Sequence, residues 1–242
     1  AKEITQAMLI AAVHALAGSA AVISTEEALE GGRLTLNMPE ALRGTPGVMI
    51  QKTSNGQASP YIRGFTGFRN VMLVDGIRLN NSVFRDGPNQ YWNTVDSFSF
   101  GRVELLRGPS SVLYGSDAIG GVVNVLSDLA ALPDGFTPRA LYRYASAENS
   151  NTARAEASWN GAGLRARGGY TYKDYGDLEA GGDVGLQQKT GYDEQAADAR
   201  VEYDLTGDTT LVAGYQYVDQ DDAWRTHRTI YGVSWAGTTI GT

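Results

Sequence analysis

The most informative stretch of this sequence is residues 102–125, which read RVELLRGPSSVLYGSDAIGGVVNV. Its first residues, Arg102–Leu106, alternate between polar and apolar side chains, as a half-buried β-strand does. The Gly108-Pro109 pair ends that strand, because Pro lacks the backbone donor that further pairing would need. Residues 110–114 read as a short helical turn and residues 120–126 as an apolar strand. The stretch therefore predicts two short strands separated by turns.

Short elements of the same kind precede this stretch. Met38–Arg43 reads as a short helix, with Asn37 as its N-cap and Pro39 in its first turn. An Asp-Gly turn at residues 75–76 separates two short apolar runs. Short strands mixed with short helices favour a compact α+β domain over residues 20–132. The strands predicted in this part are Val48–Gln51, Val71–Val74 and Ile77–Leu79.

The pattern changes after Pro133, where polar and apolar residues alternate with a period of two. This alternation recurs in residues 152–159, 164–173, 200–205 and 211–217. Segments of about ten alternating residues with aromatic ends are typical of transmembrane β-barrel strands. A soluble antiparallel sheet with one solvent-exposed face gives the same alternation. Small Ala and Gly residues on the apolar face favour lipid contact, because they fill a protein core poorly.

The alternation also predicts how the strands face. We expect the charged side chains to point toward the preceding domain and the aromatic ones to point outward. The residues expected on the inner face are Arg154, Arg165 and Arg167. Those expected on the outer face are Trp159, Tyr170, Tyr215 and Tyr217.

Composition removes several classes of function. The 242 residues include 30 Gly and no Cys, which excludes disulfide scaffolds, Cys-ligated zinc, iron–sulfur clusters and thiol catalysis. The formal net charge of −7 argues against a nucleic-acid-binding protein, which needs a basic surface. His14 and His227 are too few for a His-rich metal or haem site built within this chain.

The familiar motifs of enzymes are missing from the sequence. It has no Gly-x-Ser-x-Gly elbow, no His-Glu-x-x-His and no phosphate-binding P-loop. Residues 115–121, GSDAIGG, have the wrong spacing for a dinucleotide site. Asp219, Asp221 and Asp222 offer oxygen ligands that suit calcium, but without EF-hand spacing they read as a solvated loop. We therefore expect no catalytic residue, no bound metal and no cofactor.

The N-terminus carries one apolar run, AMLIAAVHALA at residues 7–17. Lys2 precedes it, and Ala15-Leu16-Ala17 resembles a small-x-small cleavage site, as in a signal peptide. An ordinary buried helix is the alternative, because Ala, Met and Leu favour helix. Glu3 and the missing initiator Met weaken the signal-peptide interpretation.

Five pieces of sequence follow one another in a characteristic order. They are Pro46-Gly47-Val48, Tyr61–Gly64, Val71–Asn80, Arg102–Ser116 and Ala118–Val125. In order and spacing they resemble the plug domain of TonB-dependent outer-membrane receptors. The resemblance covers the plug, and in the C-terminal segments it is limited to their pattern of alternating polar and apolar residues.

This resemblance implies a fold, a location and a function. The fold would be an α+β plug domain followed by antiparallel strands of a plugged, 22-stranded transmembrane β-barrel. The protein would bind a scarce nutrient at a Gram-negative outer membrane and import it with energy from TonB, without being an enzyme. The ligand would be a ferric siderophore or haem, and the partners TonB, that ligand and outer-membrane lipid, with no nucleic acid. A non-transporting surface β-protein such as an adhesin, or a passive porin, is the alternative.

The chain is shorter than such a receptor. If the plug ends at Leu132, 242 − 132 leaves 110 residues, whereas 22 strands of about ten residues need about 220. A sheet with bare edges does not lie in a bilayer, so we interpret the sequence as an N-terminal fragment. The predicted parts are a signal-peptide remnant at residues 1–19, the plug at 20–132 and an incomplete barrel at 133–242.

The resemblance also implies where the plug contacts its surroundings. Arg63 and Arg107 would face acidic residues on the inner barrel wall, because buried charges need partners. Val22, Ile23, Ser24 and Thr25 resemble the short, loosely held segment that TonB binds. A first strand of the plug is the alternative for these four residues.

Two loops of the plug, residues 51–60 and 80–92, would face the outside. An Arg among aromatic side chains suits an anionic, partly aromatic ligand such as a ferric chelate. The candidate ligand-binding residues are Phe84, Arg85, Asn89, Gln90, Tyr91 and Trp92.

Overall fold

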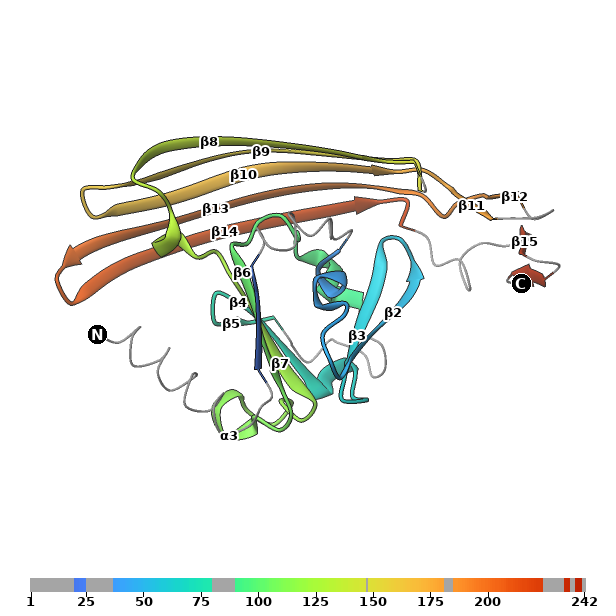
Figure 1. The fold of residues 1–242 in the computed structure, drawn as a ribbon, viewed down its shortest axis with the longest axis horizontal. Helices are drawn as coiled ribbons and strands as arrows, with labels where there is room; N and C mark the ends of the chain where they lie inside the picture. The colour runs from blue at the N-terminus through green and yellow to red at the C-terminus, as the bar shows by residue number, and fades with distance from the viewer. Residues whose placement is uncertain are drawn as a thin grey trace.

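The fold is that of a computed structural model. It describes residues 20–24, 37–79, 90–146, 148–180, 185–223, 233–235 and 238–240. Two parts lie one above the other in Figure 1: a long antiparallel sheet and, against one of its faces, a smaller N-terminal unit of strands and short helices. The residues of the expected signal peptide, 1–19, lie outside the described residues.

The N-terminal unit contains a mixed five-stranded sheet. Its strands lie in the order β1 (Ala20–Ser24), β6 (Arg102–Arg107), β7 (Gly121–Leu126), β4 (Asn70–Val74) and β5 (Ile77–Arg78). The central neighbours β4 and β7 run parallel, and the other pairs are antiparallel. A parallel pair cannot be joined by a tight hairpin, so this sheet is not a continuous meander. The α+β fold predicted for this part is confirmed.

Short helices and a hairpin complete this unit. The segment after Asn37 is a 3-10 helix, and the Asn37 side chain caps it by accepting a hydrogen bond of 3.2 Å from the Glu40 amide. The predicted cap is therefore confirmed, on a tighter helix than expected. The helical segments are η1 (Met38–Leu42), η2 (Gly67–Arg69), η3 (Gln90–Thr94), α3 (Ser111–Tyr114) and η4 (Leu129–Ala131).

The expected loop at residues 51–60 is instead part of a hairpin. Strand β2 (Val48–Ser54) pairs with β3 (Gln57–Ile62), and Asn55-Gly56 forms the turn between them. Asn-Gly is a strong hairpin signal. Pro60 lies within the second strand, which belongs to a two-stranded sheet, where one edge carries no partner and a Pro is tolerated.

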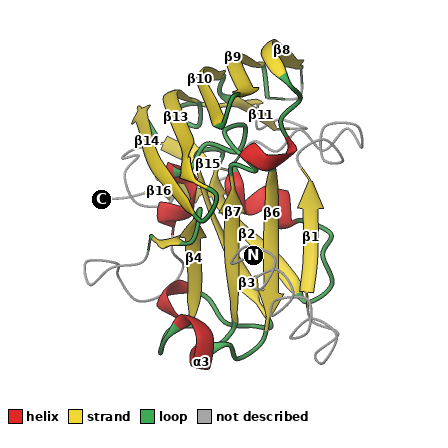
Figure 2. Cartoon of the chain, turned by 90° about the vertical axis from the view of Figure 1, so that its left-hand side faces the viewer, coloured by secondary structure: helices red, strands yellow, loops and turns green. Residues whose placement is uncertain are grey.

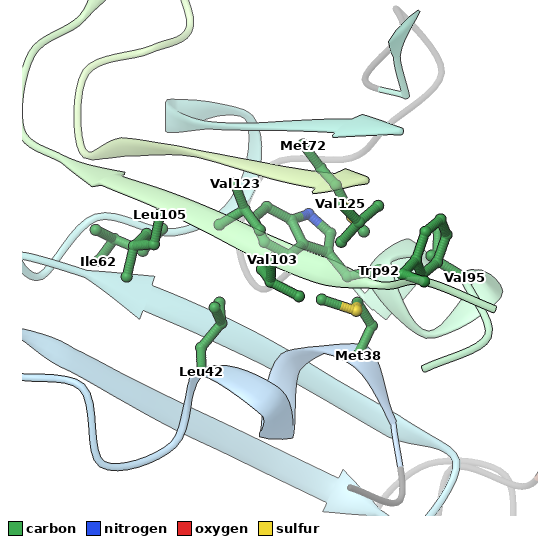
Figure 3. Close-up of a cluster of buried hydrophobic side chains, with 11 residues drawn as sticks. Met38, Leu42, Ile62, Met72, Trp92, Val95, Val103, Leu105, Val123 and Val125 are labelled. Atoms are coloured by element: carbon green, nitrogen blue, oxygen red, sulfur yellow. The ribbon is translucent and has the colours of Figure 1, made fainter. Parts of the chain in front are cut away.

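The core of the N-terminal unit lies between its sheet and the β2–β3 hairpin. Figure 3 shows Trp92 among valines of β6 and β7, with Met38 and Leu42 of η1 closing the other side. Trp92 is 1% exposed. The buried members of this cluster are Met38, Leu42, Ile62, Met72, Trp92, Val95, Phe100, Val103, Leu105, Val123 and Val125.

The long sheet is a chain of antiparallel neighbours. Its strands are β8 (Gly135–Ala145), β9 (Ser150–Gly161), β10 (Leu164–Tyr175), β13 (Tyr192–Thr206) and β14 (Thr209–Asp221). Each pairs with the next one in the sheet. Two small antiparallel pairs are also described. Strand β11 (Leu178–Ala180) pairs with β12 (Gly185–Gln187), and β15 (Val233–Trp235) pairs with β16 (Thr238–Ile240). Among the described residues, no helix is long and apolar enough to cross a membrane.

The two faces of the long sheet differ as predicted. Its outer face is aromatic and apolar, and Trp159, Tyr170, Tyr215 and Tyr217 are all exposed there. Arg154, Arg165 and Arg167 share the opposite face, which meets the N-terminal unit. Apolar and aromatic side chains outside with charged side chains inside form the pattern of a transmembrane barrel wall.

Candidate functional site

The N-terminal unit meets the long sheet along one seam, as Figure 2 shows from the side. Residues 96–100, which lead into β6, pack against the charged inner face of β9 and β10. Since the seam joins segments far apart in the chain, it fixes how the two parts sit together. Any movement of one part against the other would have to break contacts of this seam.

The centre of the seam is Asp96, whose carboxylate gathers three side chains of the long sheet. Thr171 donates a hydrogen bond of 2.6 Å from Oγ1 to Oδ2 of Asp96. Lys173 Nζ lies 3.0 Å from Oδ1, and Arg154 Nη1 lies 3.5 Å from Oδ2. All four residues are buried. We call these residues, Asp96, Arg154, Thr171 and Lys173, the Asp96 cluster.

Electrostatics keep Asp96 ionised in this buried place. Burial by itself would raise the pKa of the Asp96 carboxyl. The positive charge of Lys173, the Thr171 hydrogen bond and the charge of Arg154 outweigh burial, so the pKa lies below its ordinary value of 3.8. Hydrogen bonds and opposite charges favour the ionised form in this way. Asp96 therefore carries its full negative charge at neutral pH.

The cations of the cluster have further carboxylate partners on the long sheet. Lys173 donates to Glu194 at 2.6 Å, and Gln220 donates to the same carboxylate at 2.6 Å. Arg154 binds Asp198 at 2.8 Å and Glu156 at 2.7 Å. A buried charge pair is stable only when its remaining hydrogen-bonding groups are also satisfied. The network meets this condition around Asp96.

Two more arginines of the long sheet, one on β10 and one on β13, extend the seam. Arg167 binds Glu156 at 3.0 Å and reaches the carbonyl oxygen atoms of Phe98 and Ser127 at 3.5 Å. Arg200 of β13 lies 2.8 Å from Asp75, which follows β4. The seam therefore joins carboxylates of the N-terminal unit to cations of the long sheet.

The connections of the long sheet give its orientation. Residues 162–163 and 207–208 close tight turns at one end, while residues 176–191 form a long excursion at the other (Figure 1). Barrel proteins of the outer membrane have short periplasmic turns and longer extracellular loops. The end with β11 and β12 corresponds to the extracellular end of such a barrel.

At this extracellular end the tip of the β2–β3 hairpin lies under two tyrosines. The rings of Tyr175 and Tyr192 stack with centroids 4.7 Å apart. A Cβ atom added at Gly56 would lie 3.3 Å from the Tyr192 ring, so the ring covers the Gly56 backbone. Gln57 Nε2 donates to the Ala223 carbonyl at 3.0 Å. The hairpin tip, Asn55 and Gly56, is thus the outermost described contact of the seam.

A cavity of about 370 Å³ lies at the opposite end of the seam. Arg102 and Asp128 line it from the N-terminal unit, and Arg139, Glu156 and Arg167 line it from the long sheet. Charged side chains line part of it, and it is large enough to hold water. Among the described residues, no group of three or more His, Cys, Asp or Glu is arranged to hold a metal ion.

Comparison with known proteins identifies this arrangement. Residues 12–122 match the family model described as the TonB-dependent receptor plug domain. The vitamin B12 transporter BtuB of Vibrio vulnificus (strain CMCP6) is 29% identical over 163 residues, which are 66% of this chain and 26% of that protein.

Residues 12–122 of this chain belong to the plug-domain family of TonB-dependent receptors. The family is one of receptors of the Gram-negative outer membrane. The N-terminal unit of this chain is the plug, and its long sheet is part of the barrel wall. We use these two names from here on.

Solved structures of plugged barrels share this fold. The ferric enterobactin receptor PfeA of Pseudomonas aeruginosa superposes with a TM-score of 0.62 and 22% identity, over 84% of this chain and 33% of PfeA. The pyoverdine outer-membrane receptor FpvA of Pseudomonas aeruginosa PAO1 gives 0.63 and 20% identity, over 84% of this chain and 27% of FpvA. The chain spans about a quarter to a third of the length of these relatives.

The structure places Arg63 and Arg107 around Gly47. A Cβ atom added at Gly47 would lie 4.0 Å from both side chains, and Arg107 donates to the Pro46 carbonyl. The seam described above uses carboxylates of the plug, Asp75 and Asp96, rather than these two arginines. The expected contact of Arg63 and Arg107 with acidic residues of the wall stays a prediction.

The candidate ligand residues divide into three groups. Phe84, Arg85 and Asn89 lie outside the described residues, and of Gln90 only the backbone, at the start of η3, is described. Tyr91 is 41% exposed. Trp92 belongs to the core of the plug, so its expected contact with a ligand is wrong. Its apolar ring is buried among the valines of β6 and β7 instead.

The candidate TonB-binding segment falls on an edge strand. Val22, Ile23 and Ser24 pair with β6, with Ile23 opposite Val103, and Thr25 lies outside the described residues. Since β1 lies at the end of its sheet, one of its edges has no partner strand in that sheet. A paired strand differs from the loosely held segment expected, and the alternative of a first plug strand describes these residues.

Proposed function

We propose that this chain is the N-terminal part of a receptor that binds a scarce nutrient outside the cell and imports it with energy from TonB. The observation that carries the proposal is a plug seated against the barrel wall through a charged seam. A plug of this kind closes the barrel and can separate from the wall without breaking a covalent bond. The protein would therefore act as a transporter and not as an enzyme.

The domain boundary belongs to this proposal. The plug would comprise residues 20–132 and the wall would begin at residue 133. Helix η4 ends at Ala131, and strand β8 begins at Gly135. The short connection between them supports this boundary.

We propose a ferric siderophore as the ligand. Tyr91 is exposed beside a segment that carries Phe84 and Arg85 in the sequence, and aromatic side chains with an Arg suit an anionic, partly aromatic chelate. The solved relatives named above bind enterobactin and pyoverdine, according to their names. Haem and vitamin B12 are the two competing ligands, the second because the sequence relative BtuB is named for it.

Binding by the purified full-length receptor distinguishes the three ligands. Titration calorimetry with a ferric catecholate, haem and cyanocobalamin would be run in one detergent, with the iron-free catecholate as the matched control. We expect saturable binding of the ferric chelate and weaker binding of the iron-free form. Saturable binding of cyanocobalamin alone would replace the proposed ligand by a corrinoid and leave the receptor function in place.

The TonB contact is tested on strand β1. Strand addition uses backbone hydrogen bonds along an edge, and a Pro removes one donor. We expect Ile23→Pro to abolish uptake while ligand binding to whole cells stays unchanged. Uptake at the wild-type rate would place the TonB-binding segment elsewhere, and loss of binding as well would make β1 a structural strand only.

A further inference from the structure

The seam between plug and wall is unevenly built along β10. At its centre, the Asp96 carboxylate binds a hydroxyl and two cations of the wall within 3.5 Å, and each cation has a second carboxylate. Separating the plug here would remove Thr171, Lys173 and Arg154 from the buried Asp96 carboxylate. Uncompensated buried charge strongly opposes such a separation.

The extracellular end of the seam is weaker. The described contacts that hold the hairpin tip to the wall include the Tyr192 ring over Gly56 and a neutral hydrogen bond from Gln57 to Ala223. No ion pair joins the hairpin tip to the wall within the described part of the chain. A neutral contact of this kind is replaced by water at little cost, in contrast to a buried ion pair.

Polar groups around the hairpin tip also favour the entry of water. Asn55 Nδ2 and Asn93 Oδ1 are buried and have no hydrogen-bond partner among the described residues. A buried polar atom without a partner raises the free energy of the closed state, because water would satisfy it. Opening the contact to solvent removes this penalty.

The hairpin tip is held firmly within the plug itself. Asn93 Nδ2 donates to the Gly56 carbonyl at 2.7 Å, and Asn37 Nδ2 donates to the Asn55 carbonyl at 3.2 Å. These two bonds join the tip to η3 and to the cap of η1. When the wall contact breaks, the tip therefore moves with the plug and does not stay with the wall.

We propose that the plug parts from the wall first at the Gly56–Tyr192 contact, while the Asp96 cluster holds the plug to the wall. Gly56 and Tyr192 are then the residues whose separation opens the outer end of the seam. Asp96 is the positioning residue that keeps the plug attached to the wall while the outer contact opens. The uptake test below rests on the proposed function, but the labelling test does not.

Labelling of single cysteines measures the opening directly. Asn55→Cys and Ser99→Cys are a matched pair, because each native residue is 4% exposed and residues 1–242 contain no Cys. Any cysteine elsewhere in the full-length receptor would first be replaced by Ser. The full-length receptor in outer-membrane vesicles would be treated with a maleimide in the absence of any ligand. We expect the thiol at position 55 to react at least about tenfold faster than that at position 99, since local opening exposes the weaker contact first. Equal rates, or faster reaction at position 99, would overturn the proposal.

A disulfide across the outer contact tests its role in transport. In the Gly56→Cys/Tyr192→Cys double variant, oxidation would join the plug to the wall where we expect it to open. Uptake should be lost on oxidation and restored by reduction, with ligand binding retained in both states. The single variants treated with the same oxidant are the controls and should keep their uptake. Uptake by the oxidised double variant at its reduced rate would overturn the proposal.

The two tests separate this proposal from the proposed function. If cells carrying the wild-type receptor bind a ligand but do not import it, the transport function fails. The labelling ratio between positions 55 and 99 still decides how the seam opens in that case.

Discussion

Thr171 donates a hydrogen bond of 2.6 Å to Asp96, and this bond crosses from the barrel wall to the plug. The two residues are 75 positions apart in the chain. Around the bond, Lys173 and Arg154 neutralise the carboxylate, so a single plug residue joins three side chains on two wall strands. The stability of the plug within the wall should therefore depend on this one carboxylate.

Asp96→Asn tests this dependence. The substitution leaves the size of the side chain unchanged but removes the charge that Lys173 and Arg154 face. Removing one partner of a buried ion pair costs about 3–5 kcal/mol, and we expect about 3 kcal/mol because both cations keep other carboxylates. Denaturant unfolding of the plug in the detergent-solubilised receptor measures the loss.

Asp117→Asn is the matched control for that substitution. Asp117 pairs with Arg78 at the surface of the plug. Exposed ion pairs contribute about 0–1 kcal/mol, so this variant should remain close to wild type. Equal losses in the two variants would show that the Asp96 cluster has no special role.

The pH dependence of plug stability should follow the Asp96 carboxyl. Its pKa in the folded state lies below the ordinary value of 3.8, because Lys173, Thr171 and Arg154 together outweigh burial. The stabilisation is therefore fully present above about pH 4 and is lost as the pH falls through the lower folded pKa. The difference in unfolding temperature between wild type and Asp96→Asn should be constant from about pH 7 to 5 and shrink below about pH 4. A difference that disappears already near neutral pH would contradict this assignment.

Gly169 and its neighbour Gly168 offer a paired test of the network. A Cβ atom at Gly169 would collide with the Arg154 guanidinium, whose Cζ lies 2.6 Å from that position. Since Arg154 is fixed by Asp198 and Glu156, Gly169→Ala should cost about 1–3 kcal/mol of plug stability. Gly168→Ala meets its nearest atom at 3.4 Å and should change stability by less than about 0.5 kcal/mol. The same unfolding assay applies, and a larger loss at Gly168 would contradict the geometry.

Tyr91 and Trp92 should separate ligand binding from folding. Trp92→Ala removes a ring from the core of the plug and should cost about 3–5 kcal/mol of stability. Tyr91 is exposed, so Tyr91→Ala should leave stability unchanged and weaken binding of the ferric chelate about fivefold through the lost aromatic contact. Calorimetry measures both quantities on the same samples. Unchanged affinity in Tyr91→Ala would remove this residue from the ligand site.

The fold could be predicted from the sequence where local chemistry decides it. The Asn37 cap, the Asp75-Gly76 turn and the alternation in β9, β10, β13 and β14 each depend on residues a few positions apart. Residues 51–60 are expected from the sequence to form a loop, whereas the Asn55-Gly56 turn is a local signal for the hairpin that the structure contains.

The site itself was much less predictable. Nothing local pairs Asp96 with Lys173 or Asp75 with Arg200, because these contacts exist only once the plug lies against the wall. The expectation that plug arginines face wall carboxylates came from family resemblance and stays a prediction. The aromatic ring of Trp92 indicated a ligand contact, although aromatic rings also bury large apolar areas in protein cores.

Uptake of radiolabelled ligand by whole cells with and without TonB tests the central claim most directly. The full-length receptor would be expressed in both strains, and binding at low temperature would be measured beside the uptake rate. We predict equal binding in the two strains and uptake only in the strain that has TonB. Equal uptake in both strains would contradict the account and indicate a passive pore, and binding with no uptake in either strain would contradict it in favour of a surface protein that does not transport.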